Sequence, residues 1–233
     1  MAFLAAVAAW LTDPLHWQGS DGIPTRVMEH LELSAAATAI AVLLALPLGI
    51  YLGHSRRFGF SAVNAANVGR ALPSLALIAL ALPVSFALGL GLGFWPTLIA
   101  LVPLGIPPIL TNSLTSVREV DRDVVDAARG MGLSGWQLLF QIEIPIAAPI
   151  VIAGVRNAAV AIVATATLGA VVAGGGLGRY IVDGLARQEH ERLFAGALLV
   201  ALLAIVTELA FGVLERLAVS PGVRRELQPG APD

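Results

Sequence analysis

The stretch "DAARGMGLSGWQLLFQIEIP", residues Asp126–Pro145, lies between long apolar segments and decides how the chain is organised. Four residues in and beside it recur at the spacing i, i+3, i+4, i+7, one face of a short helix: Val124, Ala127, Ala128 and Met131. Gly130 and Gly132 follow, and glycine commonly ends helices. The methyl side chains of Ala127 and Ala128 either admit a close partner surface or pack this loop against its own bundle.

A second helix is predicted directly after this glycine turn. Ser134 and Gln137 have the S-x-x-Q spacing of a capping box, in which each residue bonds the backbone of the other. Apolar residues continue the helix: Trp136, Leu138, Leu139 and Ile142. Pro145 marks the start of the next hydrophobic segment, so the stretch reads as helix, glycine turn, helix.

The composition is that of a polytopic helical membrane protein. Of 233 residues, 57% are hydrophobic and 13% are charged, whereas a soluble domain is about 25% charged. The absence of Cys excludes disulfides, a thiol nucleophile and a Cys metal site. The four histidines have no metal-ligand spacing and are expected at solvated or interfacial positions: His16, His30, His54 and His190.

Five segments are long and apolar enough to span a membrane, which takes about 20 residues. They are Leu31–Gly53, Leu72–Leu92, Phe94–Leu114, Ile146–Val172 and Leu193–Leu214. The N-terminal residues 1–30 are predicted to be extracytoplasmic or interfacial, with Trp10 and Trp17 at headgroup level, or to add a sixth helix. We therefore expect an all-α membrane protein with about five transmembrane helices, or six if the N-terminal segment adds one.

The arginine distribution orients this bundle, because cytoplasmic loops carry an excess of basic residues. An external N-terminus places eight arginines on the cytoplasmic side: Arg56, Arg57, Arg118, Arg122, Arg129, Arg216, Arg224 and Arg225. Four then lie outside: Arg26, Arg179, Arg187 and Arg192. The loop 115–145 and the tail 218–233 are thus predicted to be cytoplasmic, with a membrane domain at residues 31–217.

The loop resembles the EAA signature of ABC-importer permease subunits, E-A-A-x3-G-x9-I-x-L-P. Asp126-Ala127-Ala128 is followed at that spacing by Gly132 and by Ile142-x-Ile144-Pro145, with Asp in place of Glu and Ile in place of Leu. Further segments resemble permeases for glycine betaine, choline or carnitine: Ala71–Pro83, Ala127–Gly132 and Ala164–Ile181. The resemblance runs from about Leu31 to Leu217. Paired prolines within Leu104–Val117 depart from the family pattern.

This resemblance implies a type I ABC-importer permease in a bacterial inner membrane. The loop would then hold a coupling helix that docks on a separate ATP-hydrolysing subunit through eight candidate residues: Asp126, Ala127, Ala128, Gly130, Gly132, Leu133, Ile142 and Pro145. The implied partners are ATP-binding subunits, a second permease subunit and an extracytoplasmic substrate-binding protein. ATP and Mg²⁺ would be bound by the partner, with no cofactor in this chain. The expected cargo is an osmoprotectant, with a methionine-type importer as the alternative.

Other classes of function find less support in the sequence. The glycine-rich segment Gly169–Gly178 lacks the G-K-[ST] ending of a phosphate loop and follows a membrane helix. It is expected to bend the chain before a short outer helix at Arg179–Arg187, whose charges either meet a binding protein or are solvated. No nucleophile–base arrangement indicates a hydrolase. A self-sufficient secondary transporter would call for ion-coupling acids and often inverted repeats, and we find one candidate acid and no repeat.

Four intramembrane polar residues are candidate functional positions: Arg156, Asn157, Thr165 and Glu208. Arg156 lies about 16 Å into the fourth span and Glu208 about 10–12 Å from the cytoplasmic end of the fifth. A lone charge near mid-bilayer costs about 2.5–3.5 kcal/mol. Arg156 and Glu208 are therefore predicted to face the protein interior and to pair or share a polar network.

Overall fold

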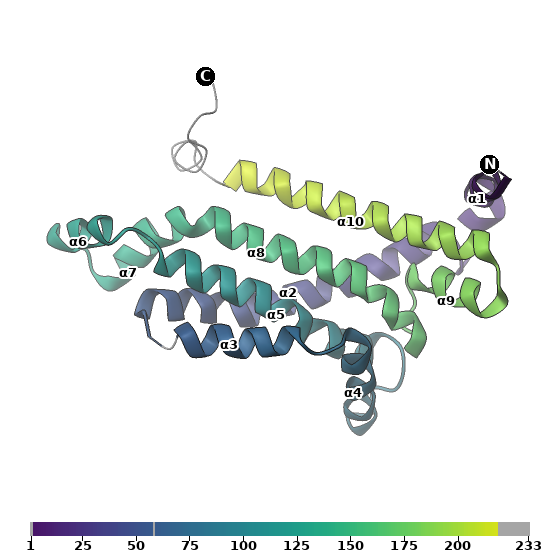
Figure 1. Cartoon of the computed structure of the whole chain (residues 1–233), viewed down its shortest axis with the longest axis horizontal. Coiled ribbons are helices and arrows are strands. Elements are labelled where there is room, and N and C mark those ends of the chain that lie inside the picture. The colour runs from purple at the N-terminus through teal and green to yellow at the C-terminus, as the bar shows by residue number, and fades with distance from the viewer. Residues whose placement is uncertain (1, 58, 219–233) are drawn as a thin grey trace, which may run out of the picture.

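The computed structural model describes residues 2–57 and 59–218, and every regular element in these ranges is a helix (Figure 1). In chain order they are α1 (Ala2–Thr12), η1 (Pro14–Trp17), α2 (Ile23–Ser55), α3 (Gly59–Arg70), α4 (Ser74–Ala87), α5 (Phe94–Arg118), α6 (Arg122–Gly130), α7 (Gly135–Leu138), η2 (Leu139–Glu143), α8 (Ile144–Thr165), η3 (Ala166–Val172), α9 (Gly178–Arg187) and α10 (His190–Ala218). The expected all-α class is confirmed. The predicted tail at 218–233 lies outside the described residues, apart from Ala218.

Within the described residues, four helical runs are long and apolar enough to cross a membrane: Ile23–Ser55, Phe94–Arg118, Gly135–Val172 and His190–Ala218. A fifth crossing is formed if the bent pair Ser61–Arg70 and Ser74–Ala87 counts as one span. The short apolar helix α1 is too short to span on its own. The count of about five spans is therefore confirmed.

The second predicted span, Leu72–Leu92, contains one helix, α4, which has 14 residues, ends at Ala87 and is too short to span on its own. A crossing here also needs α3, which meets α4 at an angle of 93°. Pro73 lies at the break, where it lacks an N–H and pushes the preceding residue away from helical geometry. After α4, Gly89 and Gly91 adopt positive φ angles of 72° and 71°. These glycines turn the chain toward α5.

The centre of the bundle is the packing of α2, α5 and α8, which run side by side in Figure 1. Glycines set the close approach of these helices. A Cβ on Gly49 of α2 would lie 2.8 Å from Ser113 Cβ on α5, and one on Gly154 of α8 would lie 2.6 Å from Asn112 Cβ. Small residues at helix crossings are how apolar helices pack closely within a membrane. The third span stays helical despite three internal prolines, Pro103, Pro107 and Pro108.

The second helix of the opening stretch does not end before the membrane. Helices α7, η2, α8 and η3 form one helical run of 38 residues, Gly135–Val172. The π-helical turn η2, Leu139–Glu143, precedes Pro145, and the Ile144 amide bonds the Leu139 carbonyl. Pro145 lies in the first turn of α8 and has no N–H to donate to the turn before it, and the π-helical turn η2 lets the helical run continue past it. The predicted entry to the span at Pro145 agrees with the start of α8 at Ile144, but the preceding helix joins α8 without a break.

Candidate functional site

The loop between α5 and α8 folds around a small apolar core of its own. Val125 and Ala128 of α6 are buried against Leu138 of α7. The helix begins at the N-cap Asp121, whose carboxylate accepts a bond from the Asp123 amide. This core holds α6 at the end of the molecule opposite α1 and α9 (Figure 1).

The glycine turn and the capping box predicted for this loop are both present. Gly132 has a φ of +88°, the left-handed conformation that glycine adopts at low cost. The capping box is complete: the Ser134 hydroxyl accepts from the Gln137 amide, and the Gln137 side chain accepts from the Ser134 amide. The helix, glycine turn and helix of the opening stretch are therefore confirmed as local structure.

The predicted face of α6 divides into a buried part and an exposed part. Ala128 is buried, whereas Val124, Ala127 and Met131 are exposed and lie at the spacing i, i+3, i+7. We call these three residues the apolar stripe of α6. The face that packs inward is instead Val125 and Ala128. One alanine of the pair thus anchors the loop, and the other is free to meet a partner.

The eight predicted coupling residues all lie in this loop or at the start of α8. Five are exposed, namely Asp126, Ala127, Gly130, Gly132 and Pro145; Leu133 and Ile142 are half-buried, and Ala128 is buried. Two aromatic side chains that were not among them add to the exposed surface. Trp136 and Phe140 are 73% and 59% exposed, and their rings stack with centroids 5.9 Å apart.

A histidine–glutamate contact ties this loop to the first span. His54 Nδ1 at the end of α2 lies 2.5 Å from a carboxylate oxygen of Glu143, whose side chain is only 2% exposed. Sequence patterns give no signal for a pair separated by 89 residues. The contact buries the carboxylate where η2 joins α8 and so fixes the base of the loop on α2.

The expectation that all four histidines are solvated or interfacial is wrong for His30. That side chain is 1% exposed, and its Nε2 lies 2.8 Å from the Val163 carbonyl oxygen of α8. Its position within a helix crossing explains the burial, because the ring fills space between α2 and α8 beside Gly176. Within the described residues no group of three or more His, Asp or Glu side chains forms a metal-binding cluster.

The intramembrane charges Arg156 and Glu208 are neighbours, as predicted. Arg156 Nε lies 3.4 Å from Glu208, and its Nη1 lies 3.3 Å from a second carboxylate, Glu215. Glu208 is half exposed on the surface of this chain, so the pair lies at the edge of the α8–α10 contact rather than deep inside. Asn157 is exposed, and Thr165 is half-buried at the end of α8.

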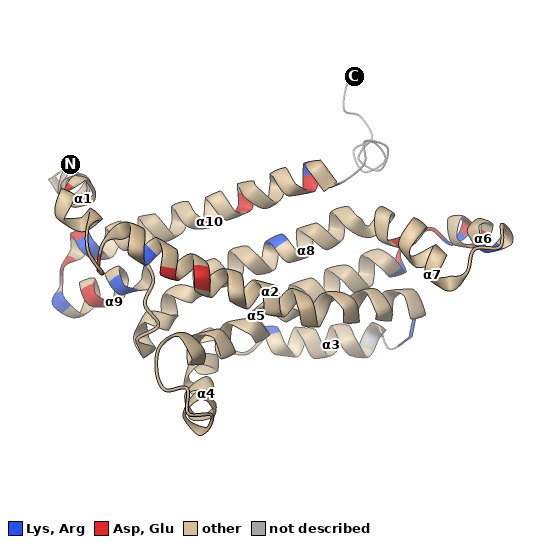
Figure 2. Cartoon of the chain, turned by 180° about the vertical axis from the view of Figure 1, so that it is seen from behind, with Lys and Arg blue, Asp and Glu red and all other residues tan. Residues whose placement is uncertain are grey.

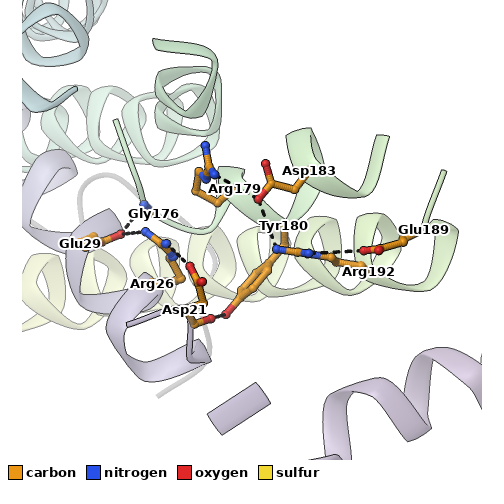
Figure 3. Close-up of polar contacts among 9 residues, drawn as sticks. All are labelled: Asp21, Arg26, Glu29, Gly176, Arg179, Tyr180, Asp183, Glu189 and Arg192. Carbon is orange, nitrogen blue, oxygen red and sulfur yellow. Dashed lines mark hydrogen bonds and ion pairs between the residues drawn. The ribbon is translucent and has the colours of Figure 1, made fainter. Parts of the chain in front are cut away.

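The opposite end of the molecule holds a network of ion pairs (Figure 3). Arg26 bridges Asp21 and Glu29, and Glu29 also accepts a bond of 2.8 Å from the Gly176 amide. Arg192 bridges Asp183 and Glu189, each at 3.3 Å. Figure 2 shows that charged residues gather at the two ends of the molecule and are sparse along the spans. The predicted outer helix is α9, and its Arg179 and Asp183 belong to this network.

Two groups of the network have displaced pKa values. The hydrogen bond and the charge of Arg26 hold the pKa of Asp21 below its usual range. Burial raises the pKa of Tyr180 to about 12, and its hydroxyl donates a bond of 2.5 Å to the Asp21 carbonyl oxygen. Both features join α9 to the start of α2.

Residues 45–219 match the family described as the binding-protein-dependent transport system inner membrane component. The chain belongs to this family. The permease is 34% identical to the glycine betaine/carnitine/choline transport system permease protein OpuCB of Bacillus subtilis, over 84% of this chain and 88% of that protein. It is 36% identical to the carnitine transport permease protein OpuCB of Listeria monocytogenes, over 87% of this chain and 90% of that protein.

A third relative is the osmoprotectant import permease protein OsmW of Salmonella typhimurium, 30% identical over 91% of this chain and 100% of that protein. Among solved structures, a chain of the inward-facing MetNI methionine ABC transporter matches the permease with a TM-score of 0.76 at 18% identity. It covers 90% of this chain and 100% of that chain. The type I ABC-importer fold expected from the EAA-like loop is therefore confirmed.

Proposed function

We propose that the permease is the membrane subunit of an ABC importer for quaternary amines such as glycine betaine, carnitine or choline. ATP is hydrolysed by separate subunits that dock on the α6–α7 loop, and an external binding protein delivers the cargo. Two permease subunits, identical or different, enclose the path. Two relatives at 34% and 36% identity are named for glycine betaine, carnitine or choline transport, and a third at 30% is named for osmoprotectant import. This likeness supports the same class of cargo here.

The observation that carries the coupling role is the exposed apolar stripe of α6. A helix in water exposes its polar side and buries its apolar side, yet Val124, Ala127 and Met131 face away from the loop's own core. Exposed apolar residues on a loop with a fixed shape favour a protein partner. The buried His54–Glu143 contact supports the transmission of force from this loop to α2 and α8.

The orientation of the permease follows from the same assignment. Docking of the ATPase subunits requires the α6–α7 loop to be cytoplasmic, which agrees with the excess of arginines at that end. The membrane domain then extends over residues 31–217, with residues 1–30 outside the cytoplasm. The end that carries the α9 network faces the binding protein.

Substitution Ala127→Asp tests the docking. A charge in the middle of the apolar stripe is expected to abolish co-purification of the ATPase subunit from membranes, while the permease still inserts. The matched control is Ala186→Asp, which places the same charge on an exposed helical alanine of α9 at the other end of the molecule. Normal ATPase recovery with Ala127→Asp would contradict the docking site.

The cargo is tested with the assembled transporter in proteoliposomes. We expect ATP-dependent uptake of radiolabelled glycine betaine, carnitine or choline in the presence of the binding protein. L-Methionine is the comparison solute. Uptake of methionine without uptake of any quaternary amine would replace the proposed cargo with that of the methionine importers.

A further inference from the structure

We propose that the break between α3 and α4 forms a subsite in the permease that binds the carboxylate of the transported zwitterion through Arg70. A cavity of about 260 Å³ lies at this break. Its lining includes Arg70 and Leu72 from the two sides of the break, Pro107 and Pro108 from α5, and Asn157 from α8. The inference rests on the proposed function, because it assigns the place where part of that cargo is held.

The cavity lies near the middle of the membrane by two independent measures. Pro107 is 13 residues after Phe94 and 11 before Arg118, the ends of α5, or about 20 Å and about 16 Å along the helix. Asn157 is about 18 Å beyond Pro145 on α8. A broken helix at such a depth exposes polar backbone and is tolerated where it lines a cavity. Transporters commonly bind substrate at breaks of this kind.

Arg70 is the one unmatched charge at this depth within residues 2–57 and 59–218. Arg156, at similar depth, is paired with Glu208 and Glu215. Arg70 has neither an ion pair nor a side-chain hydrogen bond to any described residue, and its side chain is exposed. A guanidinium in the membrane interior faces a watery cavity or an anion rather than lipid. Its planar donors match a carboxylate in a two-point contact.

The rest of the lining suits a small zwitterion with a quaternary amine. The cavity is slightly below the range of drug-sized pockets, about 300–1,000 Å³. A quaternary ammonium has no N–H to donate, so apolar walls such as those of Leu104, Pro107 and Pro108 leave no hydrogen bond unmade. The first turn of α4 begins at Ser74 with no side-chain cap, and its positive end adds to the attraction for an anion.

This arrangement predicts different behaviour for cargo with and without a carboxylate. Glycine betaine and carnitine carry one, and choline does not. An arginine without a counter-anion opposes the passage of choline and favours the two zwitterions. Arg70 thus acts as a specificity-determining residue in the permease itself, in addition to any selection by the binding protein.

The test is uptake by the complete transporter, with its ATPase and binding protein, in proteoliposomes. Rates are normalised to the amount of assembled complex. For Arg70→Gln we expect uptake of glycine betaine and carnitine to fall at least about tenfold relative to choline. Arg70→Lys keeps the charge and is expected to recover part of the loss. Arg57→Gln, which removes an exposed arginine from the α2–α3 connection, is the matched control and is expected to leave all three rates unchanged.

Three outcomes would overturn the subsite. An equal loss for all three compounds would mean that Arg70 pairs with a partner subunit instead of cargo. Unchanged betaine and carnitine rates would mean that it contacts neither. A wild-type transporter that moves choline but neither zwitterion would exclude the carboxylate contact and leave the quaternary-amine function intact. Failure of the wild type to move any quaternary amine would instead be a failure of the proposed function.

Discussion

Arg156 illustrates how single charges are accommodated in this apolar chain. Two carboxylates contact its guanidinium, Glu208 of α10 and Glu215 about two turns further along the same helix. The sequence predicted the first partner because antiparallel spans bring residues of equal depth together. It did not predict the second, since Glu215 lies just beyond the predicted end of the fifth span at Leu214. A long arginine side chain reaches both depths.

A double-mutant cycle measures this contact. We expect Arg156→Gln and Glu208→Gln to show a coupling energy of about 0.5–1 kcal/mol in thermal unfolding, at the low end for contacting residues because Glu208 is half exposed. Arg156→Gln should cost more than Glu208→Gln, since it leaves Glu208 and Glu215 both unpaired. Strictly additive losses would show that the two side chains do not interact.

Tyr180 provides a pH-dependent signal at the residue scale. Its folded-state pKa is raised from 10.0 to about 12 because burial disfavours the phenolate. The unfolded chain loses this proton first, so unfolding releases a proton and stability falls as the pH rises from about 10 to about 12. An absorbance titration near 295 nm should contain a component with a midpoint near 12 that Tyr180→Phe removes. Retention of that component in the variant would assign it elsewhere.

At the scale of whole helices, small residues decide how close the spans lie. A Cβ on Gly105 of α5 would meet Ala41 Cβ at 2.8 Å and Ile162 Cδ1 at 2.9 Å, so this position connects α2, α5 and α8. Such contacts leave no trace in hydropathy, which reports only that each segment is apolar. The lengths of the spans are therefore predictable from the sequence, and their partners are not.

Gly105→Ala tests this packing. Overpacking of a tight crossing costs about 1–3 kcal/mol, and we expect a lower melting temperature for the purified permease in detergent. The control is Gly212→Ala on α10, where a Cβ meets nothing within 4 Å. That change should be neutral or stabilising, since alanine is the better helix former by about 1 kcal/mol. A neutral Gly105→Ala would contradict the close crossing.

The second span shows a feature that hydropathy does not predict, namely the bend between α3 and α4. Leu72–Leu92 is continuously apolar, and an average over such a window reports one helix. The break before α4 depends on Pro73, and the early end of α4 is followed by the positive-φ glycines Gly89 and Gly91. By contrast, the α6–α7 loop was predictable in detail, because its caps and turn are local features of the chain. The His54–Glu143 contact was not, because it joins distant segments.

At the scale of the whole molecule, one end carries the exposed apolar stripe of α6 and the other end is tied by ion pairs. Charged residues are sparse along the spans between the two ends (Figure 2). No Walker motif occurs in the sequence. Under the proposed function, ATP is therefore hydrolysed by separate subunits.

The permease purified alone is expected to hydrolyse no ATP above background, because its sequence has no Walker motif to bind phosphate and magnesium. A malachite-green phosphate assay across the final size-exclusion fractions provides the measurement. The same preparation mixed with its ATPase subunit is the positive control. Phosphate release that tracks the permease polypeptide through to homogeneity would overturn the division of labour between the subunits.

The helical run from Gly135 to Val172 joins the α6–α7 loop directly to the segment that precedes the glycines at the other end of the molecule (Figure 1). Its α8 part alone has 22 residues and is about 33 Å long. A tilt of about 5° in a helix of this length displaces its far end by about 3 Å. Under the proposed function, a movement of the docking loop is therefore carried toward the opposite end of the permease by one continuous helical segment. Substitutions that make this helical segment more flexible, without altering the surfaces at its two ends, are expected to uncouple ATP turnover from transport.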